Sequence, residues 1–464
     1  MMWDSPPILF LCIKKLNVKL WQKGAGQVTS SRIETFTVGQ DRILDIHLAP
    51  FDLLGNMAHA IMLQSIGLLT TEDTQKLLDA CRDIYDNLAE FTLEEGIEDV
   101  HSQVEYLLTQ RLGDIGKKIH SGRSRNDQVL VDLKMYMRHE VEQIVHLAAD
   151  LFQALNQQSR KHQATLLPGY THLQVAMPSS FGLWFGAYAE SLLDDLQILL
   201  GTYRIINKNP LGSGAGYGSS FPLDRQMTTE LLGFDALHYN VVYAQMSRGK
   251  TETLLLQAVS SFAQTLSRLA MDVCLYNSQN FGFVDLPTEM TTGSSIMPHK
   301  KNPDVAEILR GKTNRLKALP LEIQLIMANL PSGYHREMQL IKEILIPAVQ
   351  DIKECLSMTT FLIEHMKVRE GLLNDPKYDV IFSVENVNQR VMEGMPFRDA
   401  YKEVGLAIEA GSFIPQRDLD HTLLGSLGNP AQDAVEFSWQ ATIKEFNFEK
   451  VHEAYAKLLA YRID

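Results

Sequence analysis

Long helices dominate the pattern of apolar and polar positions in the middle of the chain. Between Gly122 and Pro168 there is neither glycine nor proline, and apolar residues recur there mostly at steps of three and four. A second window of the same kind runs from Gly249 to Gly282. This spacing puts the apolar side chains on one face of an α-helix. The pattern predicts two long amphipathic helices, which need partners to bury their apolar faces.

Two further helices are expected after the second window. One follows Pro303 and is broken by Gly311 and Pro320, and the other follows Pro347, because proline is accepted in the first turn of a helix and disfavoured in its interior. The flanking residues 40–112 and 375–464 carry shorter helical patterns separated by turn signals. Period-two alternation, which marks strands, is scarce.

The chain is therefore predicted to be all-α and built in three parts. We expect an N-terminal helical domain over residues 18–124, a central long-helix bundle over 125–374 and a small C-terminal helical domain over 375–464. Residues 1–17 are expected to be a leader outside the fold, with Val18 as the natural start.

Composition and charge exclude several classes of protein. Of 464 residues, 45% are hydrophobic and 21% are charged, and the net charge of −13 disfavours a nucleic-acid partner. The longest apolar run, residues 8–13, is too short to cross a membrane. The four cysteines lie far apart, which disfavours a disulfide framework or a metal site and favours reduced thiols in the cytoplasm.

Two glycine-containing segments resemble nucleotide-binding loops. Residues 212–218 resemble a dinucleotide loop, but Tyr217 replaces the third glycine and no βαβ unit surrounds it, so a turn between helices is expected. Residues 244–251 fit a relaxed phosphate loop that follows a β-like run at 239–243 and opens a helix. An NTPase in which Lys250 contacts phosphate stays an alternative hypothesis.

Residues 292–304, TGSSIMPHKKNPD, form the chemically informative segment. Gly293 and two serines predict a mobile polar loop. Asn302 and Pro303 are expected to serve as the N-cap and first turn of the following helix. Lys300 stands beside that positive helix end, so the segment is suited to binding carboxylates and stabilising negative charge.

This segment resembles the GSSxMPxKxNP signature of the fumarase/aspartase superfamily, whose members eliminate fumarate from succinyl compounds. Other stretches narrow the resemblance to the argininosuccinate lyase family. They are EDVH at 98–101 followed by Glu105, HSGRSRNDQ at 120–128, PGYTHLQ at 168–174 and LGSGA at 211–215, together with Tyr334, Gln339 and Lys342. The resemblance covers nearly all of residues 19–375.

The resemblance implies anti elimination of argininosuccinate to arginine and fumarate, the last step of arginine biosynthesis, without metal or organic cofactor. It implies Ser294 as the base, its anion stabilised by Lys300, by amide N–H groups and by loop closure. His172, oriented by Glu307, is the other acid/base residue. Which of Ser294 and His172 is acid and which is base stays open.

The resemblance also implies the substrate contacts and the assembly. The succinyl carboxylates are assigned to Lys300 with Arg123 or Arg125, and the arginine portion to Tyr334, Gln339 and Lys342. The full set of implied substrate-binding residues is His101, Arg123, Arg125, Asn126, Thr171, Arg248, Asn302, Tyr334, Gln339 and Lys342. The implied assembly is a homotetramer with a twenty-helix core, in which each active site draws on three chains.

Some positions depart from the family pattern. Residues 22–24 differ from the usual Gly-Gly-Arg, and a substrate-contacting serine is replaced near Gly39, where only the backbone N–H is expected to substitute. Gly249 stands where an acidic residue usually follows Arg248, and Leu340-Ile341 replaces an acidic pair. These changes leave open another fumarate-releasing lyase with altered amino-side specificity, or a crystallin-like structural homologue.

Overall fold

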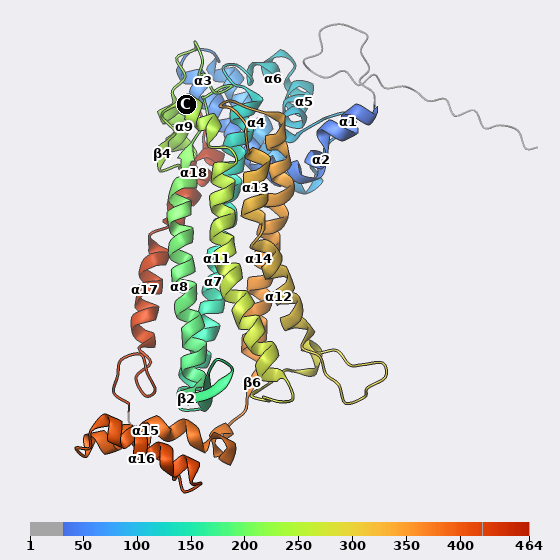
Figure 1. The fold of residues 1–464 in the computed structure, drawn as a ribbon. Coiled ribbons are helices and arrows are strands. Elements are labelled where there is room, and N and C mark those ends of the chain that lie inside the picture. The colour runs from blue at the N-terminus through green and yellow to red at the C-terminus, as the bar shows by residue number, and fades with distance from the viewer. Residues whose placement is uncertain (1–30, 420, 464) are drawn as a thin grey trace, which may run out of the picture.

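The computed structural model describes residues 31–419 and 421–463 of the chain. The expected leader, the start at Val18 and the departure at 22–24 lie outside the described residues. Within the described part, long helices run side by side in a tall bundle, with short helices gathered at one end and a smaller helical group at the other (Figure 1). The prediction of an all-α protein is confirmed, since the sheets of this part are small two-stranded ones.

The two longest predicted helices are confirmed. The long helices of the bundle are α7 (Arg125–Lys161), α8 (Phe181–Ile206), α11 (Lys250–Asn277), α12 (Asp304–Leu316) and α14 (Ile341–His365). Ser124 caps α7 in a capping box with Asp127, whose carboxylate accepts the Ser124 N–H at 2.9 Å. The apolar faces of α7 and α11 are buried, as their periodicity requires.

Helix α8 is absent from the sequence prediction although it packs along both α7 and α11. Its glycines at 182, 186 and 201 interrupt the glycine-free windows that indicated the other long helices. Gly182 is needed for packing, because a Cβ there would lie 2.6 Å from Cα of Gln163 and 2.8 Å from the Ser159 carbonyl oxygen. Glycine here permits close approach of two chain segments rather than a turn.

The predicted limits of the later helices need correction. Gly311 lies inside α12, and the break comes after Leu316, before α13 (Leu319–Met327). Helix α14 begins at Ile341 and contains Pro347 in its interior, so it does not start after that proline. Burial of the surrounding apolar side chains compensates for the one backbone hydrogen bond that proline removes.

Short elements surround the end of the bundle at which α7 begins, which we call the N-terminal end of the bundle. They are α1 (Ser31–Val38), α2 (Asp41–Leu44), the 3₁₀-helices η1 (Asp45–Leu48) and η2 (Leu88–Glu90), α3 (Ala49–Ser65), α4 (Thr71–Asp86), α5 (Val100–Leu112) and α6 (Asp114–Lys118). The connections carry β3 (Lys208–Asn209), α9 (Arg225–Leu231), β4 (Ala236–Leu237), α10 (Val241–Met246), β5 (Val284–Asp285), η3 (Thr288–Met290), η4 (Arg336–Leu340) and β6 (Lys367–Val368). Thr70 caps α4 by accepting the Asp73 N–H at 3.1 Å.

The C-terminal segment packs at two places on the bundle. Its elements are η5 (Leu372–Asn374), η6 (Pro376–Phe382), α15 (Ser383–Met392), α16 (Phe397–Glu409), α17 (Gln432–Lys444) and α18 (Phe448–Ala460). Helices α15 and α16 lie at the far end of the bundle around a small core of their own. Helices α17 and α18 run back along the bundle, where Trp439 stacks on Phe152 with ring centroids 4.2 Å apart. The three-domain division stays a prediction.

None of the described helices combines the length and the apolar character needed to cross a bilayer.

Candidate active site

A polar cavity of about 140 Å³ gathers most of the predicted substrate-binding residues at the N-terminal end of the bundle. Those that line it are His101, Arg125, Asn126, Arg248, Tyr334, Gln339 and Lys342. Carboxylates line it too, at Asp41, Asp45, Glu98 and Asp99. Residues separated by more than two hundred positions in sequence therefore meet here.

Several helices begin at this cavity. Arg125 is the first residue of α7, Arg248 lies two residues before α11, and Lys342 is the second residue of α14. Asp99 is the N-cap of α5 and accepts the Ser102 N–H at 2.8 Å. Because the N-terminal end of each helix carries partial positive charge, this arrangement favours a negatively charged ligand.

Ion pairs fix the cations of the cavity. Lys342 is buried and its Nζ lies 2.9 Å from Asp41 and 2.5 Å from Asp45. Burial opposes the charged amine, but the two carboxylates outweigh it and raise the pKa of Lys342. Burial raises the pKa of Asp41 to about 6 against the opposing charge of Lys342. Arg125 pairs with Asp99 at 3.0 Å, and Arg336 pairs with Glu98.

Arg123 departs from its predicted position. It is not among the residues that line the cavity, and its Nη2 donates to Asn56 Oδ1 at 2.6 Å. Asn56 Nδ2 in turn donates to Asp52 Oδ2 at 2.8 Å, and Asp52 accepts from His101. Arg123 therefore reaches the cavity through a chain of hydrogen bonds.

Thr171 and His172 lie at the tip of a β-hairpin that the sequence prediction missed. Strands β1 (Leu166–Thr171) and β2 (Gln174–Ser180) are antiparallel and pair Thr171 with Gln174. The two-residue turn His172-Leu173 has φ values of 54° and 56°. Such turns favour Asn-Gly, because most other residues are strained at positive φ. The turn exposes His172, and the strain is stored at a candidate catalytic residue.

Ser294 lies in a loop whose base is closed by Thr292 and Asn302. The Asn302 N–H donates to the Thr292 carbonyl at 2.9 Å, and the Thr292 N–H donates back at 3.3 Å. The predicted N-cap role of Asn302 is wrong, because its backbone forms this bridge and α12 begins at Asp304 after Pro303. Within the loop, the Ile296 and Met297 N–H groups donate to Ser294 Oγ at 3.3 and 3.1 Å.

The described chain does not bring the predicted residues into one site. The hairpin that carries His172 and the loop that carries Ser294 lie toward the end of the bundle opposite the cavity (Figure 1). Helix α7 alone spans about 55 Å between those ends. Among the described residues, no hydrogen bond or ion pair joins His172 to Glu307, and both are exposed. The predicted orientation of His172 by Glu307 is thus not formed within one chain.

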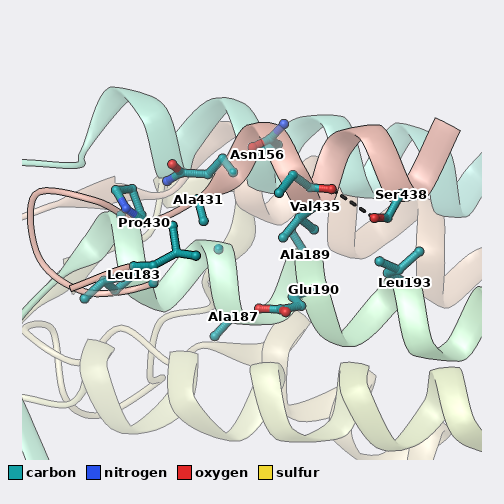
Figure 2. A pocket seen from close by; sticks show the side chains of 16 residues that line it. Asn156, Leu183, Ala187, Ala189, Glu190, Leu193, Pro430, Ala431, Val435 and Ser438 are labelled. Carbon is teal, nitrogen blue, oxygen red and sulfur yellow. Dashed lines mark hydrogen bonds between the residues drawn. The ribbon is translucent and has the colours of Figure 1, made fainter. Parts of the chain in front are cut away.

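A larger cavity of about 410 Å³ lies between α8 and α17 (Figure 2). Small residues of α8, such as Gly186 and Ala189, leave this space open beside Val435. None of the predicted site residues lines it. The polar cavity at the other end is therefore the better candidate for substrate binding.

Comparison with known proteins assigns the chain to a protein family. A family model described as a lyase matches residues 22–317. An argininosuccinate lyase of Parabacteroides distasonis is 59% identical over 443 residues, which are 95% of this chain and 99% of that protein. An argininosuccinate lyase of Bacteroides fragilis is 58% identical over the same share of both chains. The chain belongs to the argininosuccinate lyase family. It is a carbon–nitrogen lyase by that membership.

A solved structure agrees with this family at the level of the fold. The structure of EDDS lyase in complex with formate has a TM-score of 0.73, with 21% sequence identity, and covers 94% of this chain and 95% of that chain. At that identity the likeness extends to the all-α architecture alone.

The departures from the argininosuccinate lyase pattern have structural reasons. The expected substitute at Gly39 is wrong, because its N–H already donates to the Thr35 carbonyl at 3.2 Å. Gly249 has a φ of 80°, and a Cβ there would lie 2.7 Å from the Met327 side chain, so a larger residue would be strained and would displace Met327. Glu252 replaces the missing acidic neighbour, since its carboxylate lies 3.2 Å from Arg248 and accepts the Gly249 N–H at 2.7 Å.

The two nucleotide-like segments have other roles in this family member. The expected turn at 212–218 is confirmed, and the Gly212 and Gly214 N–H groups donate to the Asp127 carboxylate at 3.0 and 2.9 Å. Burial raises the pKa of Asp127 to about 6 in spite of these bonds. The β-like run at 239–243 is wrong, because Asn240 caps α10 there. The strand that a phosphate loop requires is therefore not formed.

Sequence reasoning missed the polar residues of the buried helix α3. Asp52, Asn56 and His59 follow one another at steps of four and three residues, and all are buried in an otherwise largely apolar helix. A polar stripe at helical spacing inside an apolar segment indicates a buried network. Asp132 of α7 joins the same network, and nothing in the periodicity of α7 singles it out.

Proposed function

We propose that this protein cleaves argininosuccinate to arginine and fumarate in the cytoplasm, without metal or organic cofactor. The observation that carries the proposal is a pair of hydrogen bonds that the Ile296 and Met297 N–H groups donate to Ser294 Oγ. A serine hydroxyl is a weak base, and its anion needs hydrogen-bond donors that are already in place. The loop supplies such donors, and Lys300 in the same loop adds positive charge.

In the proposed elimination, Ser294 accepts one proton and His172 donates another. The Ser294 alkoxide removes the proton from the carbon beside a succinyl carboxylate, which leaves a dianionic aci-carboxylate. The electron pair then forms the double bond of fumarate as the carbon–nitrogen bond breaks. The leaving guanidino nitrogen takes a proton from the His172 imidazolium. The products are fumarate and arginine with a protonated guanidinium group.

The polar cavity suits the arginine portion of the substrate. Lys342, which is paired with Asp41 and Asp45, and Arg248, which is paired with Glu252, present both signs of charge to the carboxylate and amino groups of an amino acid. Gln339 is already oriented, because its Nε2 donates to the Thr37 and Val38 carbonyl oxygens at 3.2 and 3.0 Å.

We propose a homotetramer whose active sites combine three chains. The exposure of His172 and Glu307 supports this, because neither has a described partner within its own chain. Exposed apolar side chains along the bundle supply the surface for such an assembly. They include Ile198 and Ile205 of α8, Met271 of α11, Ile308 of α12 and Leu321 and Leu325 of α13.

The proposed function predicts a clear result from a panel of succinyl compounds. Purified protein should release fumarate, followed by its ultraviolet absorbance, from argininosuccinate and not from adenylosuccinate, aspartate or malate. Release from another member of the panel with none from argininosuccinate would contradict the substrate assignment. A folded protein that releases no fumarate from any of them would support the crystallin-like alternative. ATP should leave the rate unchanged.

A further inference from the structure

His101 presents an unpartnered donor position to the polar cavity. Its side chain is 5% exposed and lines the cavity, and its Nε2 has no hydrogen-bond partner among the described residues. The other ring nitrogen is engaged, since Nδ1–H donates to Asp52 Oδ1 at 2.8 Å and lies 3.3 Å from Asp132 Oδ2. A buried polar atom that faces a cavity without a partner indicates a ligand contact.

The protonation state of His101 decides which ligand Nε2 accepts. With Nδ1–H donated to Asp52, a neutral ring carries a lone pair at Nε2, which repels a carboxylate. Only the imidazolium has a second N–H to donate from that atom. Binding of a carboxylate here therefore requires that His101 be charged.

The two buried carboxylates differ in their surroundings. Asp52 has both oxygens engaged, Oδ1 by His101 and Oδ2 by Asn56. Burial raises the pKa of Asp132 well above its usual value, and the negative charge of Asp52 and a hydrogen bond to it raise it further. These influences favour the protonated form of Asp132. A pair that holds one proton carries one negative charge, which balances the imidazolium.

The surroundings of His101 favour the charged ring. Burial opposes the charge, but the hydrogen bond to Asp52 and the charges of Asp52, Asp99 and Asp45 outweigh it and raise the pKa of His101. The charged and titratable groups near it are Asp52 on α3, Asp132, Arg123 and Arg125 on or before α7, Asp99 at the start of α5, Asp45 on η1 and His120 after α6.

We propose that Asp52 and Asp132 are positioning residues that share one proton and hold His101 as an imidazolium whose Nε2–H receives a carboxylate of the substrate or product. This inference rests on the proposed function, because it assumes that the cavity belongs to the lyase site. The carboxylate belongs either to the arginine portion or to the succinyl portion of the substrate. Both share the chemistry that Nε2–H recognises, and product inhibition distinguishes them.

The test compares D52N/D132N with D132N and D132L, using L-arginine and fumarate as separate product inhibitors. The double variant keeps the size of both side chains and removes their charge. We expect its inhibition constant for one of the two products to rise about 10- to 100-fold at about pH 8. The rise should shrink at about pH 6, because acid restores the imidazolium. D132N retains a neutral donor to Asp52 and should recover most of the affinity that D132L loses.

Asp195→Asn is the matched control. Asp195 is equally buried, at 4% exposure, and accepts hydrogen bonds from Ser261 and Thr265 away from the cavity. It should alter thermal stability without changing the pH dependence of either inhibition constant. If the double variant does not fold, D52N and the pH profile of the unmodified protein are measured instead. In the unmodified protein, affinity for the inhibiting product should fall as pH rises through the raised pKa of His101.

Several outcomes would overturn the inference. A rise that is equal at both pH values, or no rise for either product, contradicts the role of the imidazolium. Equal damage by D132N and the double variant contradicts the shared proton. Loss of activity with a chelator, restored by a divalent cation, assigns the three side chains to a metal and contradicts the proposal. Unmodified protein without argininosuccinate turnover contradicts the proposed function instead.

Discussion

Replacement of Ser294 by alanine is expected to lower kcat for argininosuccinate by about 10²- to 10⁴-fold, the usual contribution of a positioned base. The Ile296 and Met297 N–H groups then lose the oxygen to which they donate, and the loop loses its proposed base. KM should change little, because the lost interaction forms chiefly in the transition state. The measurement is the initial rate of fumarate release over a range of argininosuccinate concentrations.

Ser295→Ala is the matched control for this prediction. Ser295 is the exposed neighbour in the same loop, and the two amide bonds end on Ser294. Its loss should reduce kcat by less than about 10-fold, since it removes no base. Comparable losses in both variants would assign the effect to the conformation of the loop. More activity in S294A than in S295A would contradict the role of Ser294.

His172→Asn should also reduce kcat by about 10²- to 10⁴-fold while leaving the fold intact. Asparagine tolerates the positive φ of 54° at this position, so the hairpin turn is kept and only the imidazole is lost. The effect should fall on kcat, measured as fumarate release, and thermal unfolding should occur at an unchanged or slightly higher temperature.

Leu173→Gly separates the turn from the imidazole. Leu173 has a φ of 56° and is 70% exposed, so glycine relieves strain of about 1 kcal/mol without removing packing. This variant should be at least as stable as the unmodified protein and should retain most of its turnover. If H172N keeps full activity, or if L173G is as inactive as H172N, His172 is not the acid/base group.

The sequence predicts the long helices well where periodicity acts alone. Helices α7 and α11 follow from uninterrupted apolar stripes, whereas α8 is hidden by glycines that serve close packing. The hairpin at 166–180 is hidden for a different reason. Its turn residues, His172 and Leu173, are not turn formers, and the surrounding structure imposes their conformation.

Some residues of the candidate site can be predicted from the sequence, and others can be found only in the structure. Ser294, His172 and the cavity residues are predicted from sequence motifs, because most of them lie in short consecutive stretches of the chain. Asp52 and Asp132 come from separate helices and acquire meaning only when packing brings them to His101. Sequence periodicity reports burial, and it carries no information on which buried polar groups meet. The network could therefore be found only in three dimensions.

In the proposed tetramer, Ser294 of one chain and His172 of another act in the same site, and mixing two inactive variants tests this pairing. Inactive S294A and H172N proteins, labelled with tags of different mass, are dissociated reversibly, mixed and reassembled, and mixed oligomers are verified by native mass spectrometry. Fumarate release from argininosuccinate should reappear, because some sites then combine an intact Ser294 with an intact His172. S294A mixed with the S294A/H172N double variant is the control and should stay inactive. If verified mixed oligomers of S294A and H172N remain inactive, Ser294 and His172 of different chains do not share a site.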